Sequence, residues 1–226
     1  MISVKTVLGT SLLTITIWVY IGAMRGQDWL VTEDGNYQSC KSVREWDLLR
    51  DNYYLYRFLT ELEDTVNSVE EEVARLAKIR MLVRGLLTNS YWVRSKHPQP
   101  DMDTGTSVEL LYEELGFPFT IQTVTFTPGT LSNIHNHGTW GVVAILKGRE
   151  KNIIWRRNPT TEFVDNIEKE SELILEAGDI ISFTGGAIHC VEAVSEEPTV
   201  TFNLYGETKS KERFEFDEVN HTAKNF

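Results

Sequence analysis

The second half of the chain carries the feature that most limits its fold, a run of short segments in which apolar and polar residues alternate. These segments are 118–126, 139–147, 149–157, 172–183, 187–194, 199–206 and 213–216. Glycine, proline, asparagine or aspartate separates them. A period of two indicates strands with one buried face, and many short, evenly spaced strands are typical of sandwiches and small barrels. The sequence therefore predicts a mostly β fold, either an antiparallel β-sandwich or a small barrel.

The region before these strands has a helical period. Between 41 and 65, apolar residues recur every three or four positions, which indicates an amphipathic helix. Ser68 and Glu71 have the spacing of a capping box and predict a second helix from Ser68 to about Leu87. Residues 95–107 contain proline, glycine and aspartate and are expected to form a loop. N-terminal α-helices should therefore accompany the barrel.

The chain is expected to have three parts, namely a hydrophobic segment over 1–26, a helical region over 27–106 and the barrel over 107–226. Within the first part, residues 7–24 carry no charge and are at the lower limit of length for a membrane span. Three interpretations stay open. The segment is a membrane anchor, a signal peptide, or, if translation starts at Met24, not part of the protein.

Charge and cysteine content exclude some classes of protein. The formal net charge is −11, which argues against nucleic acid as a partner, because phosphates are repelled by an acidic surface. The two cysteines, Cys40 and Cys190, are too few and too far apart for a disulfide framework or a cysteine zinc site. We therefore expect a cytoplasmic protein, held at a membrane only if the N-terminal segment anchors it.

Two histidines of the first barrel motif are candidate metal ligands. His135 and His137 are separated by one residue, so both imidazoles share a face if they lie on a strand. By itself such a pair is also compatible with buried or surface histidines that bind no metal. His97 lies in a proline-containing loop and His221 near the end of the chain, and both are expected to be solvated.

The stretch GTLSNIHNHGTWGVVAILKG, 129–148, resembles the first signature of the cupin family. Gly129 precedes His135 by six residues, His137 follows, and Gly148 closes the motif at the family spacing.

The stretch GDIISFTGGAIHCVEA, 178–193, resembles the second cupin signature. Gly178, Gly186 and His189 have the family spacing. Thr184 replaces a usual proline and Ala193 a usual asparagine, and neither change removes a ligand. The resemblance covers about half of the chain and implies a small antiparallel, jelly-roll-like β-barrel with a metal site, preceded by the N-terminal α-helices.

The glutamate that is usual in cupins would fall at Gly141. The resemblance therefore implies three neutral ligands, His135, His137 and His189. Three imidazoles on one face leave up to three positions of an octahedral ion open. An ion without a carboxylate ligand keeps its full charge, attracts a thiolate and lowers the pKa of a bound thiol. A closed structural zinc site would need a fourth protein ligand, and none is apparent.

The stretch HNHGTWGVVAILKG is similar to the thiol dioxygenase branch of the cupins, especially the bacterial mercaptopropionate and cysteine dioxygenase-like proteins. Those enzymes hold Fe(II) on three histidines and convert a thiol to a sulfinate with O₂. The resemblance implies Fe(II) as the cofactor, and a small thiol and O₂ as partners. In the animal enzymes the position of Gly141 carries a cysteine cross-linked to a tyrosine, so glycine implies no cross-link. Cys190, adjacent to a ligand on a strand, should point away from the metal.

A further run of polar residues lies on the strand TFNLYG. The family has Ser-x-His-x-Tyr there, and this chain has Thr201, Asn203 and Tyr205. Alternation predicts that all three share a face. The resemblance implies that Tyr205 forms a hydrogen bond near O₂ or substrate, whereas Asn203 cannot relay protons as an imidazole can. Tyr205 as an aromatic residue of the barrel core is the alternative.

The substrate-binding residues are less constrained. Glu109 falls near the place where cysteine dioxygenases have a carboxylate-binding arginine, and an acid there would repel a carboxylate. An amine-bearing thiol facing Glu109 is one candidate substrate. Arg213 lies near the place where the bacterial mercaptopropionate enzymes have an arginine, and a solvated surface charge is the alternative. Arg156 and Arg157 are candidates without positional support.

Two functions are left open. The first is an Fe(II)-dependent dioxygenase that oxidises cysteine or a 3-mercaptopropionate-like thiol. The second is a non-catalytic metal-binding cupin that senses or binds a small ligand, which the asparagine at position 203 favours. Other cupin chemistry, such as isomerisation or the oxidation of a non-thiol, is the remaining class.

Overall fold

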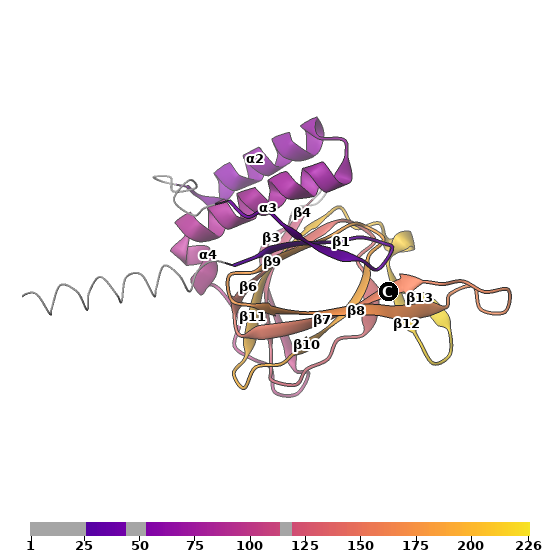
Figure 1. The fold of residues 1–226 in the computed structure, drawn as a ribbon. Helices are drawn as coiled ribbons and strands as arrows, with labels where there is room; N and C mark the ends of the chain where they lie inside the picture. Colours follow the sequence, from indigo (N-terminus) through magenta and orange to yellow (C-terminus); the bar gives the residue numbers. More distant parts are fainter. Residues whose placement is uncertain (1–25, 44–52, 114–118) are drawn as a thin grey trace, which may run out of the picture.

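The computed structural model describes residues 26–43, 53–113 and 119–226. Figure 1 shows two sheets that face each other, with a layer of helices outside one of them. Residues 7–24, for which the sequence left three interpretations, lie outside the described residues. None of the described helices is long and apolar enough to cross a membrane.

A sheet of seven strands forms the layer next to the helices. In spatial order it consists of β2 (Tyr37–Cys40), β1 (Asp28–Val31), β9 (Ile180–Phe183), β6 (Gly141–Lys147), β11 (Thr199–Gly206), β4 (Phe119–Phe126) and β3 (Thr106–Glu113). The β1–β9 pair is parallel, and the other described pairs of this sheet are antiparallel.

A sheet of six strands faces it. In spatial order it consists of β13 (Thr222–Asn225), β12 (Phe214–Asp217), β5 (Ile134–Asn136), β10 (Ile188–Ala193), β7 (Arg149–Arg157) and β8 (Ile167–Glu176). All its described pairs are antiparallel. The expected mostly β, jelly-roll-like fold with N-terminal helices is confirmed, and the strands of the expected small barrel form two facing sheets. The parallel β1–β9 pair is the one departure from an antiparallel arrangement among the described strands.

In the described part of the first half of the chain there are three helices, namely α2 (Leu55–Ser68), α3 (Glu72–Asn89) and α4 (Tyr91–Ser95). Figure 1 shows α2 and α3 lying across the outer face of the seven-stranded sheet. Apolar side chains from the helices and from this face form one buried cluster. It includes Phe58, Leu62, Leu76, Ile79, Val83, Phe119, Ile121, Val142, Phe202 and Leu204. Burial of this surface attaches the helices to the seven-stranded sheet.

Polar contacts of α3 fix its position on the sheet. The Arg84 guanidinium pairs with the buried Asp28 carboxylate on β1. Arg80 donates a hydrogen bond to the Ser182 hydroxyl on β9, with the two atoms 2.6 Å apart. Because these groups are buried, each needs a partner, and the pairing joins the parallel β1–β9 pair to the helix above it.

The helix boundaries correct the expected capping box. Ser68 is the last residue of α2 and does not begin a second helix. Glu71 is the N-cap of α3, and its carboxylate accepts hydrogen bonds from the backbone N–H groups of Val73 and Ala74 at 2.9 and 2.6 Å. The carboxylate also lies at the positive end of the helix dipole, which favours this arrangement. Of the helix expected over 41–65, residues 44–52 lie outside the described residues, the described residues before Leu55 are not helical, and α2 begins at Leu55.

Several strands differ from the expected pattern. The segment 172–183 belongs to two strands, β8 and β9, because Gly178 adopts a positive φ of 97° in the turn between them. The region 27–106 is not only helical, since it supplies β1 and β2 to the seven-stranded sheet. The strands β3, β5 and β13 are also additional to the segments expected from alternation. The domain boundary at 106/107 itself stays a prediction.

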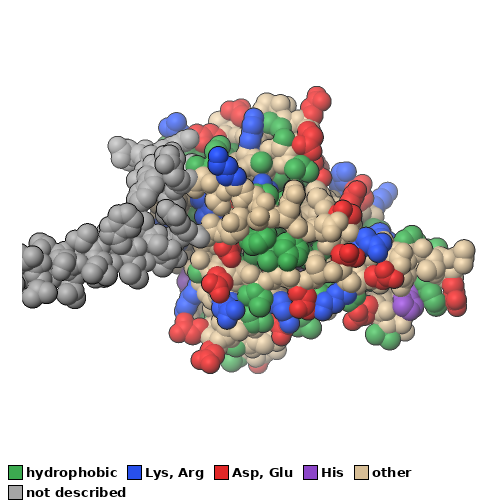
Figure 2. All heavy atoms as spheres, in the orientation of Figure 1, with side chains coloured by type: hydrophobic (Ala, Val, Ile, Leu, Met, Phe, Trp, Pro, Cys, Tyr) green, Lys and Arg blue, Asp and Glu red, His purple; other side chains and the backbone are tan. Residues whose placement is uncertain are grey.

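The outer surface of the six-stranded sheet is polar where Figure 2 shows acidic and basic side chains side by side over β7 and β8. Arg156 on β7 forms ion pairs with Glu168 and Glu170 on β8, and Arg157 pairs with Asp165. Neither arginine lines the cavity between the sheets. Both are therefore surface residues and not candidates for substrate binding.

The space between the sheets has two halves. One is filled by an apolar cluster. Its buried members are Val31, Val143, Ile145, Ile154, Leu173, Leu175, Ile181, Phe183 and Ala187. The other half is a cavity of about 500 Å³ with many polar side chains in its wall. This cavity contains the histidines singled out from the sequence.

Candidate metal centre

Three histidines meet at the wall of the cavity. His135 lies on β5, His137 follows that strand directly, and His189 lies on β10. The strands β5 and β10 are neighbours, and His189 is paired with His135 in their register. One ring nitrogen from each histidine can act as a ligand, and these three nitrogens all lie within 4.8 Å of one another. The predicted cluster of three imidazoles is therefore present.

A glycine allows the chain to turn directly after the histidine pair. Gly138 has a φ of 63°, a conformation that residues with a side chain rarely adopt. A Cβ atom there would lie 2.9 Å from the Lys209 carbonyl oxygen and 3.0 Å from the Arg213 amide nitrogen. The turn brings the segment before β12 close to the histidines and places Arg213 at the cavity.

Hydrogen bonds orient two of the rings. His135 Nδ1 lies 2.8 Å from the Asn133 carbonyl oxygen, so this nitrogen donates to it. His189 Nδ1 lies 2.9 Å from the Asn152 side-chain oxygen and donates in the same way. Each ring then has its proton on Nδ1 and the lone pair of Nε2 available, which is the usual arrangement around metal-binding histidines.

The free nitrogens are close enough to bind one ion. His137 Nε2 and His189 Nε2 lie 3.0 Å apart, a separation that fits two ligands each roughly 2.1 Å from the same ion. Burial lowers the pKa of His137 and His189 well below the usual value, and nearby positive charges lower that of His137 further. Burial also lowers the pKa of His135. All three rings are therefore neutral near pH 7, the form that binds metal, and the residues present fit a divalent ion.

No carboxylate belongs to the cluster among the described residues. Gly141, at the position of the glutamate in the cupin signature, is paired with Tyr205 of the neighbouring strand. A Cβ atom at Gly141 would lie 3.0 Å from Cδ1 of the Tyr205 ring. The tyrosine ring therefore occupies the space into which a side chain at position 141 would extend, and the ligand set of this part of the chain is three neutral imidazoles.

The predicted polar face of β11 is confirmed. Asn203 and Tyr205 line the cavity, and Thr201 connects to them by hydrogen bonds. The Tyr205 hydroxyl donates to the Asn203 side-chain oxygen at 3.2 Å, and the Asn203 amide donates to the Thr201 hydroxyl at 2.8 Å. The Tyr205 and His137 ring centroids lie 4.6 Å apart. Burial raises the pKa of Tyr205, so its hydroxyl keeps its proton and remains a donor.

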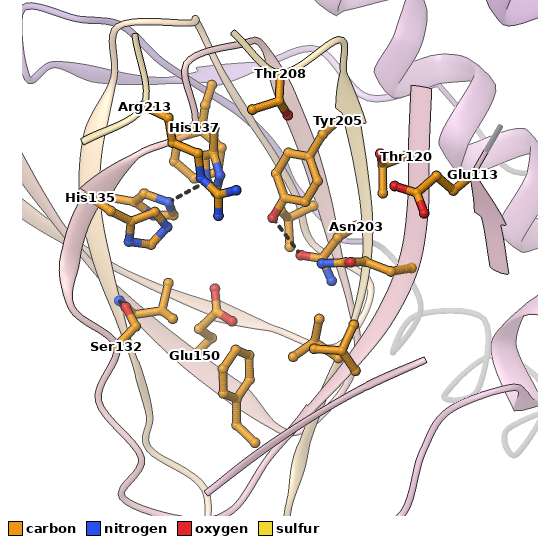
Figure 3. A pocket seen from close by; sticks show the side chains of 18 residues that line it. Glu113, Thr120, Ser132, His135, His137, Glu150, Asn203, Tyr205, Thr208 and Arg213 are labelled. Carbon is orange, nitrogen blue, oxygen red and sulfur yellow. Dashed lines mark hydrogen bonds between the residues drawn. The ribbon is translucent and has the colours of Figure 1, made fainter. Parts of the chain in front are cut away.

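Arg213 lines the same cavity, as Figure 3 shows. Its guanidinium lies over the Phe226 ring, with 4.0 Å between the guanidinium carbon and the ring centroid. Stacking of this kind holds the side chain in one orientation while its N–H groups remain able to bind an anion. The position agrees with the predicted substrate-binding arginine, whose role stays a prediction.

Glu109 is not at the site, which corrects the second predicted substrate-binding residue. Its partner in the register is Thr123, which faces the helices, whereas Val108 is paired with Val124 on the cavity face. The Glu109 carboxylate forms an ion pair with Lys96 at 3.1 Å. Because Glu109 lies on the opposite face of β3, it cannot contact a ligand in the cavity.

Two buried residues that the sequence did not single out belong to the site, since Glu150 lines the cavity and Asn152 accepts a hydrogen bond from His189. Glu150 and Asn152 alternate on the inner face of β7, and their exposed fractions are 3% and 0%. The Asn152 amide donates to the Glu150 carboxylate at 2.8 Å, while its oxygen accepts from His189. Burial raises the pKa of Glu150 to about 7. The available signal was two polar residues at the inward positions of an alternating strand.

Cys190 lies where the sequence placed it, whereas His97 and His221, expected to be solvated, are only partly exposed and each have a buried Nδ1. Cys190 follows His189 on β10 and does not line the cavity. It is buried, and burial raises the pKa of its thiol. His97 lines a separate hollow below α4, and His221 packs against the ring of Phe163.

No family model matches this sequence. Structures with a similar fold include an oxalate oxidase in complex with the substrate analogue glycolate, 14% identical, with a TM-score of 0.39 over 55% of this chain and 61% of that chain. A cupin domain of a transcriptional regulator from Enterobacter cloacae is 17% identical, with a TM-score of 0.35 over 46% of this chain and 99% of that one. A cupin conserved barrel domain protein from Salinispora arenicola is 16% identical, with a TM-score of 0.37 over 50% of this chain and 84% of that one.

The oxalate oxidase is matched over less than two thirds of its own length. Similarity at this level carries no argument about activity. The two facing sheets of the chain fit a jelly-roll fold of the cupin kind, and its three clustered histidines could hold a metal ion.

Proposed function

We propose that the protein is an Fe(II)-dependent dioxygenase that converts a small thiol to its sulfinate with O₂. The observation that carries this proposal is the cluster of three neutral histidines, without a carboxylate, in a cavity that also holds a tyrosine hydroxyl and an arginine. The reaction is RSH + O₂ → RSO₂H. Both oxygen atoms join sulfur, sulfur loses four electrons, O₂ gains them, and no further reductant is needed.

His135, His137 and His189 would hold the iron. Fe(II) supplies open coordination positions and redox chemistry to a thiol and O₂ when bound by such a set. Because none of the ligands carries a negative charge, the site attracts an anionic thiolate more strongly than a site with a carboxylate ligand would.

Tyr205 and Asn203 prepare the cavity for a reactant near the histidines. The Asn203 amide keeps a fixed orientation because its nitrogen donates to Thr201 and its oxygen accepts from Tyr205. The tyrosine hydroxyl is thereby held next to His137, where it can donate to a polar reactant after exchanging its partner. Asn203 does not titrate, so it positions Tyr205 and does not carry a proton.

The cavity provides an anchor for the substrate at the Arg213 side chain. A guanidinium binds a carboxylate through two parallel N–H···O bonds. Since Glu109 faces away from the cavity, nothing at that position repels a carboxylate. A carboxylate-bearing thiol such as 3-mercaptopropionate or cysteine therefore fits better than one that carries only an amine.

The experiment is oxygen uptake with sulfinate detection, using iron-loaded full-length protein and a panel of 3-mercaptopropionate, cysteine and cysteamine. We expect one O₂ consumed for each sulfinate formed, and loss of both signals in His137→Ala. His221→Ala, a histidine outside the cluster, is the matched control and should retain activity. Stoichiometric iron binding without turnover of any thiol would contradict the proposal.

Iron binding without turnover of any thiol would instead favour a non-catalytic metal-binding protein. The specific observation in its favour is Asn203, since an amide in the hydrogen-bond chain cannot take up or release a proton at neutral pH. Binding of a thiol to the metal-loaded protein without product is the result that this alternative predicts.

A further inference from the structure

A second hollow lies outside the cavity between the sheets and shares no lining residue with it. It has a volume of about 1040 Å³ and is bounded by α4, by the end of α3 and by parts of β6 and β9. Leu87, Leu146 and Ile180 supply apolar surface to its wall, whereas Arg84 and Arg94 supply cationic groups. Among the described residues that line it, none is acidic. The hollow therefore suits a ligand with an apolar part and an anionic part.

Arg94 is the cation of this hollow that is free to bind an anion. Its guanidinium lies 6.0 Å from the centroid of the Tyr91 ring, and it forms no ion pair with a described carboxylate. Arg84 is instead paired with the buried Asp28. In a chain with a formal net charge of −11, an exposed arginine without an acidic partner is a local site for negative charge.

His97 adds a polar atom to the same wall. Its Nδ1 is buried and has no hydrogen-bond partner among the described residues. A buried polar atom without a partner costs free energy. A polar headgroup in the hollow would supply that partner and remove the cost.

Two aromatic side chains of α4 are exposed beside Arg94. Tyr91 is 75% and Trp92 48% exposed. The helix has five residues, and Val93, fully buried in the cluster beneath the helices, attaches it to the fold. Tryptophan and tyrosine are enriched where a membrane meets water, because each ring has an apolar body and a polar tip. Together with Arg94 they form the kind of surface that contacts lipid headgroups.

The course of the chain connects this surface to an apolar segment. Residues 7–24 carry no charge, and the described chain begins just after them. Gly26 packs so closely against Gly178 that a Cβ atom on it would overlap the Gly178 carbonyl group. The Gln27 carbonyl oxygen accepts a hydrogen bond from the Ile180 backbone N–H at 2.9 Å, and both Gly178 and Ile180 line the hollow. A membrane that held residues 7–24 would therefore lie next to the hollow.

We propose that α4 and this hollow rest on a lipid bilayer that contains anionic phospholipids. The Arg94 guanidinium binds a lipid phosphate through parallel N–H···O bonds. The rings of Tyr91 and Trp92 lie at the level of the headgroups, and the apolar wall of the hollow faces the lipid chains. The acidic remainder of the protein does not prevent this contact, because exposed charges more than about 8 Å apart are largely screened at physiological ionic strength. The inference is independent of the proposed dioxygenase reaction and favours the membrane-anchor interpretation of residues 7–24.

The test places a fluorescent probe at the proposed contact in the full-length protein. Tyr91→Cys is labelled with a fluorophore that is sensitive to the polarity of its surroundings. The labelled protein is mixed with vesicles of phosphatidylcholine alone or of phosphatidylcholine with phosphatidylglycerol, and the spectrum is recorded on the protein that floats with the vesicles. The emission should shift to shorter wavelength, and more so with the anionic vesicles. Ser95→Cys, a smaller change in the same hollow, provides a second probe, and the labelled parent protein with Cys40 and Cys190 gives the background.

Val164→Cys is the matched control for the position of the probe. Val164 is 73% exposed, about as much as Tyr91. It lies in the loop between β7 and β8, which Figure 1 shows at the opposite end of the molecule from α4. A probe at this position should show no shift with either kind of vesicle.

Arg94→Glu, made in the Tyr91→Cys protein, tests the electrostatic part of the contact. A basic side chain near a membrane contributes about fivefold to the binding of anionic lipid. Reversal of its charge should therefore lower the ratio of probes in contact to probes in water by at least about fivefold on anionic vesicles. Lys211→Glu makes the same change of charge at an exposed residue before β12 and should leave the ratio unchanged.

Four results would overturn the inference. The first is no shift at either probe of the hollow, or no protein that floats with the vesicles. The second is an equal shift at Val164→Cys, which would show adsorption without a preferred face. The third is an equal shift with neutral and anionic vesicles that Arg94→Glu does not change. The fourth is the full shift with inorganic phosphate alone, which would assign the hollow to a small anion. Because the probe reports contact and not turnover, none of these outcomes bears on the dioxygenase proposal.

Discussion

The two faces of the seven-stranded sheet use the same strands for different purposes. On β11, Phe202 and Leu204 are fully buried and pack against the helices. Thr201, Asn203 and Tyr205, which alternate with them, form the hydrogen-bonded wall of the cavity. Successive side chains point to opposite faces of a strand. Substitutions at neighbouring positions should therefore differ in whether they change stability or ligand binding.

The physical character of the two faces differs accordingly. The helix face buries apolar side chains in one continuous cluster, which stabilises the fold in proportion to the area removed from water. The cavity face buries polar groups, which contribute little or destabilise when they lack partners. Glu150 is the clearest case, because burial raises the pKa of its carboxyl group to about 7 in spite of the hydrogen bond from Asn152. The comparison therefore predicts that stability resides on the helix face and ligand binding on the cavity face.

The largest effect on stability should come from Phe202→Ala. Phe202 is 0% exposed and belongs to the cluster beneath the helices, so its truncation should lower the free energy of unfolding by about 3–5 kcal/mol. Its side chain points away from the cavity, so zinc affinity of the folded protein should not change. Urea unfolding and zinc titration together check this. A variant that loses zinc while remaining folded would break the comparison between the faces.

The second effect is the pH dependence caused by Glu150. Its pKa is raised from 4.5 to about 7 in the folded protein, so the native carboxyl group keeps its proton where the unfolded one has released it. The free energy of unfolding therefore falls as pH rises from about 4.5 to about 7, by about 3 kcal/mol in total. Glu150→Gln does not titrate and should lack this loss.

The measurement is urea unfolding of metal-free protein across this pH range. Other titratable groups that line the cavity are Tyr205, Arg213, Glu113 and the histidines, and they are common to the variant and the wild type. The difference between the two proteins isolates Glu150. A difference that stays constant with pH would show that the carboxyl group is not destabilised by burial.

The sequence was sufficient to predict which side chains share the cavity face when they lie two positions apart on one extended segment. His135 and His137 are two residues apart on an extended segment, and so are Thr201, Asn203 and Tyr205. Their shared direction follows from strand geometry and needs no knowledge of neighbouring strands.

Long-range pairing decides the features that were missed. The face of Glu109 depends on its register with β4, which counting along the chain cannot give. The contact of Asn152 with His189 requires β7 to lie beside β10, although the two segments are far apart in sequence. The parallel pairing of β1 with β9 likewise joins residues that are separated by most of the chain, as Asp28 and Ile180 are. Alternation along one strand predicts which residues share a face, whereas the contacts between strands depend on how the strands pair in the folded protein.

A smaller effect should follow from Asn152→Ala, which tests the inner face of β7. The substitution leaves His189 Nδ1 without its 2.9 Å partner, and loss of such an orienting hydrogen bond lowers metal affinity by about 10- to 100-fold. Ile153→Ala, on the outer face of the same strand, is the matched control. Zinc competition with a chelating dye should separate the two variants, and equal affinities would exclude Asn152 as an orienting residue.

The smallest expected effect is that of Gly141→Ala, which adds a methyl group on β6 against the Tyr205 ring of the neighbouring strand β11. The new Cβ would lie 3.0–3.1 Å from the Tyr205 ring, so the ring must move by a few tenths of an ångström, at a cost of about 1 kcal/mol of stability. The movement should also weaken the 3.2 Å hydrogen bond from Tyr205 to Asn203, with zinc affinity unchanged because neither residue is a ligand.

Tyr205→Phe provides the comparison for that variant, since it removes the hydroxyl and leaves the ring in place. If the ring position matters through its hydroxyl, both variants should slow sulfinate formation alike, and the double variant should slow it no further than either one. A loss of zinc in Gly141→Ala alone would mean that the methyl group displaces a histidine instead. The expected result would explain the neutral ligand set physically, because a glutamate at position 141 and a tyrosine ring at position 205 compete for the same space.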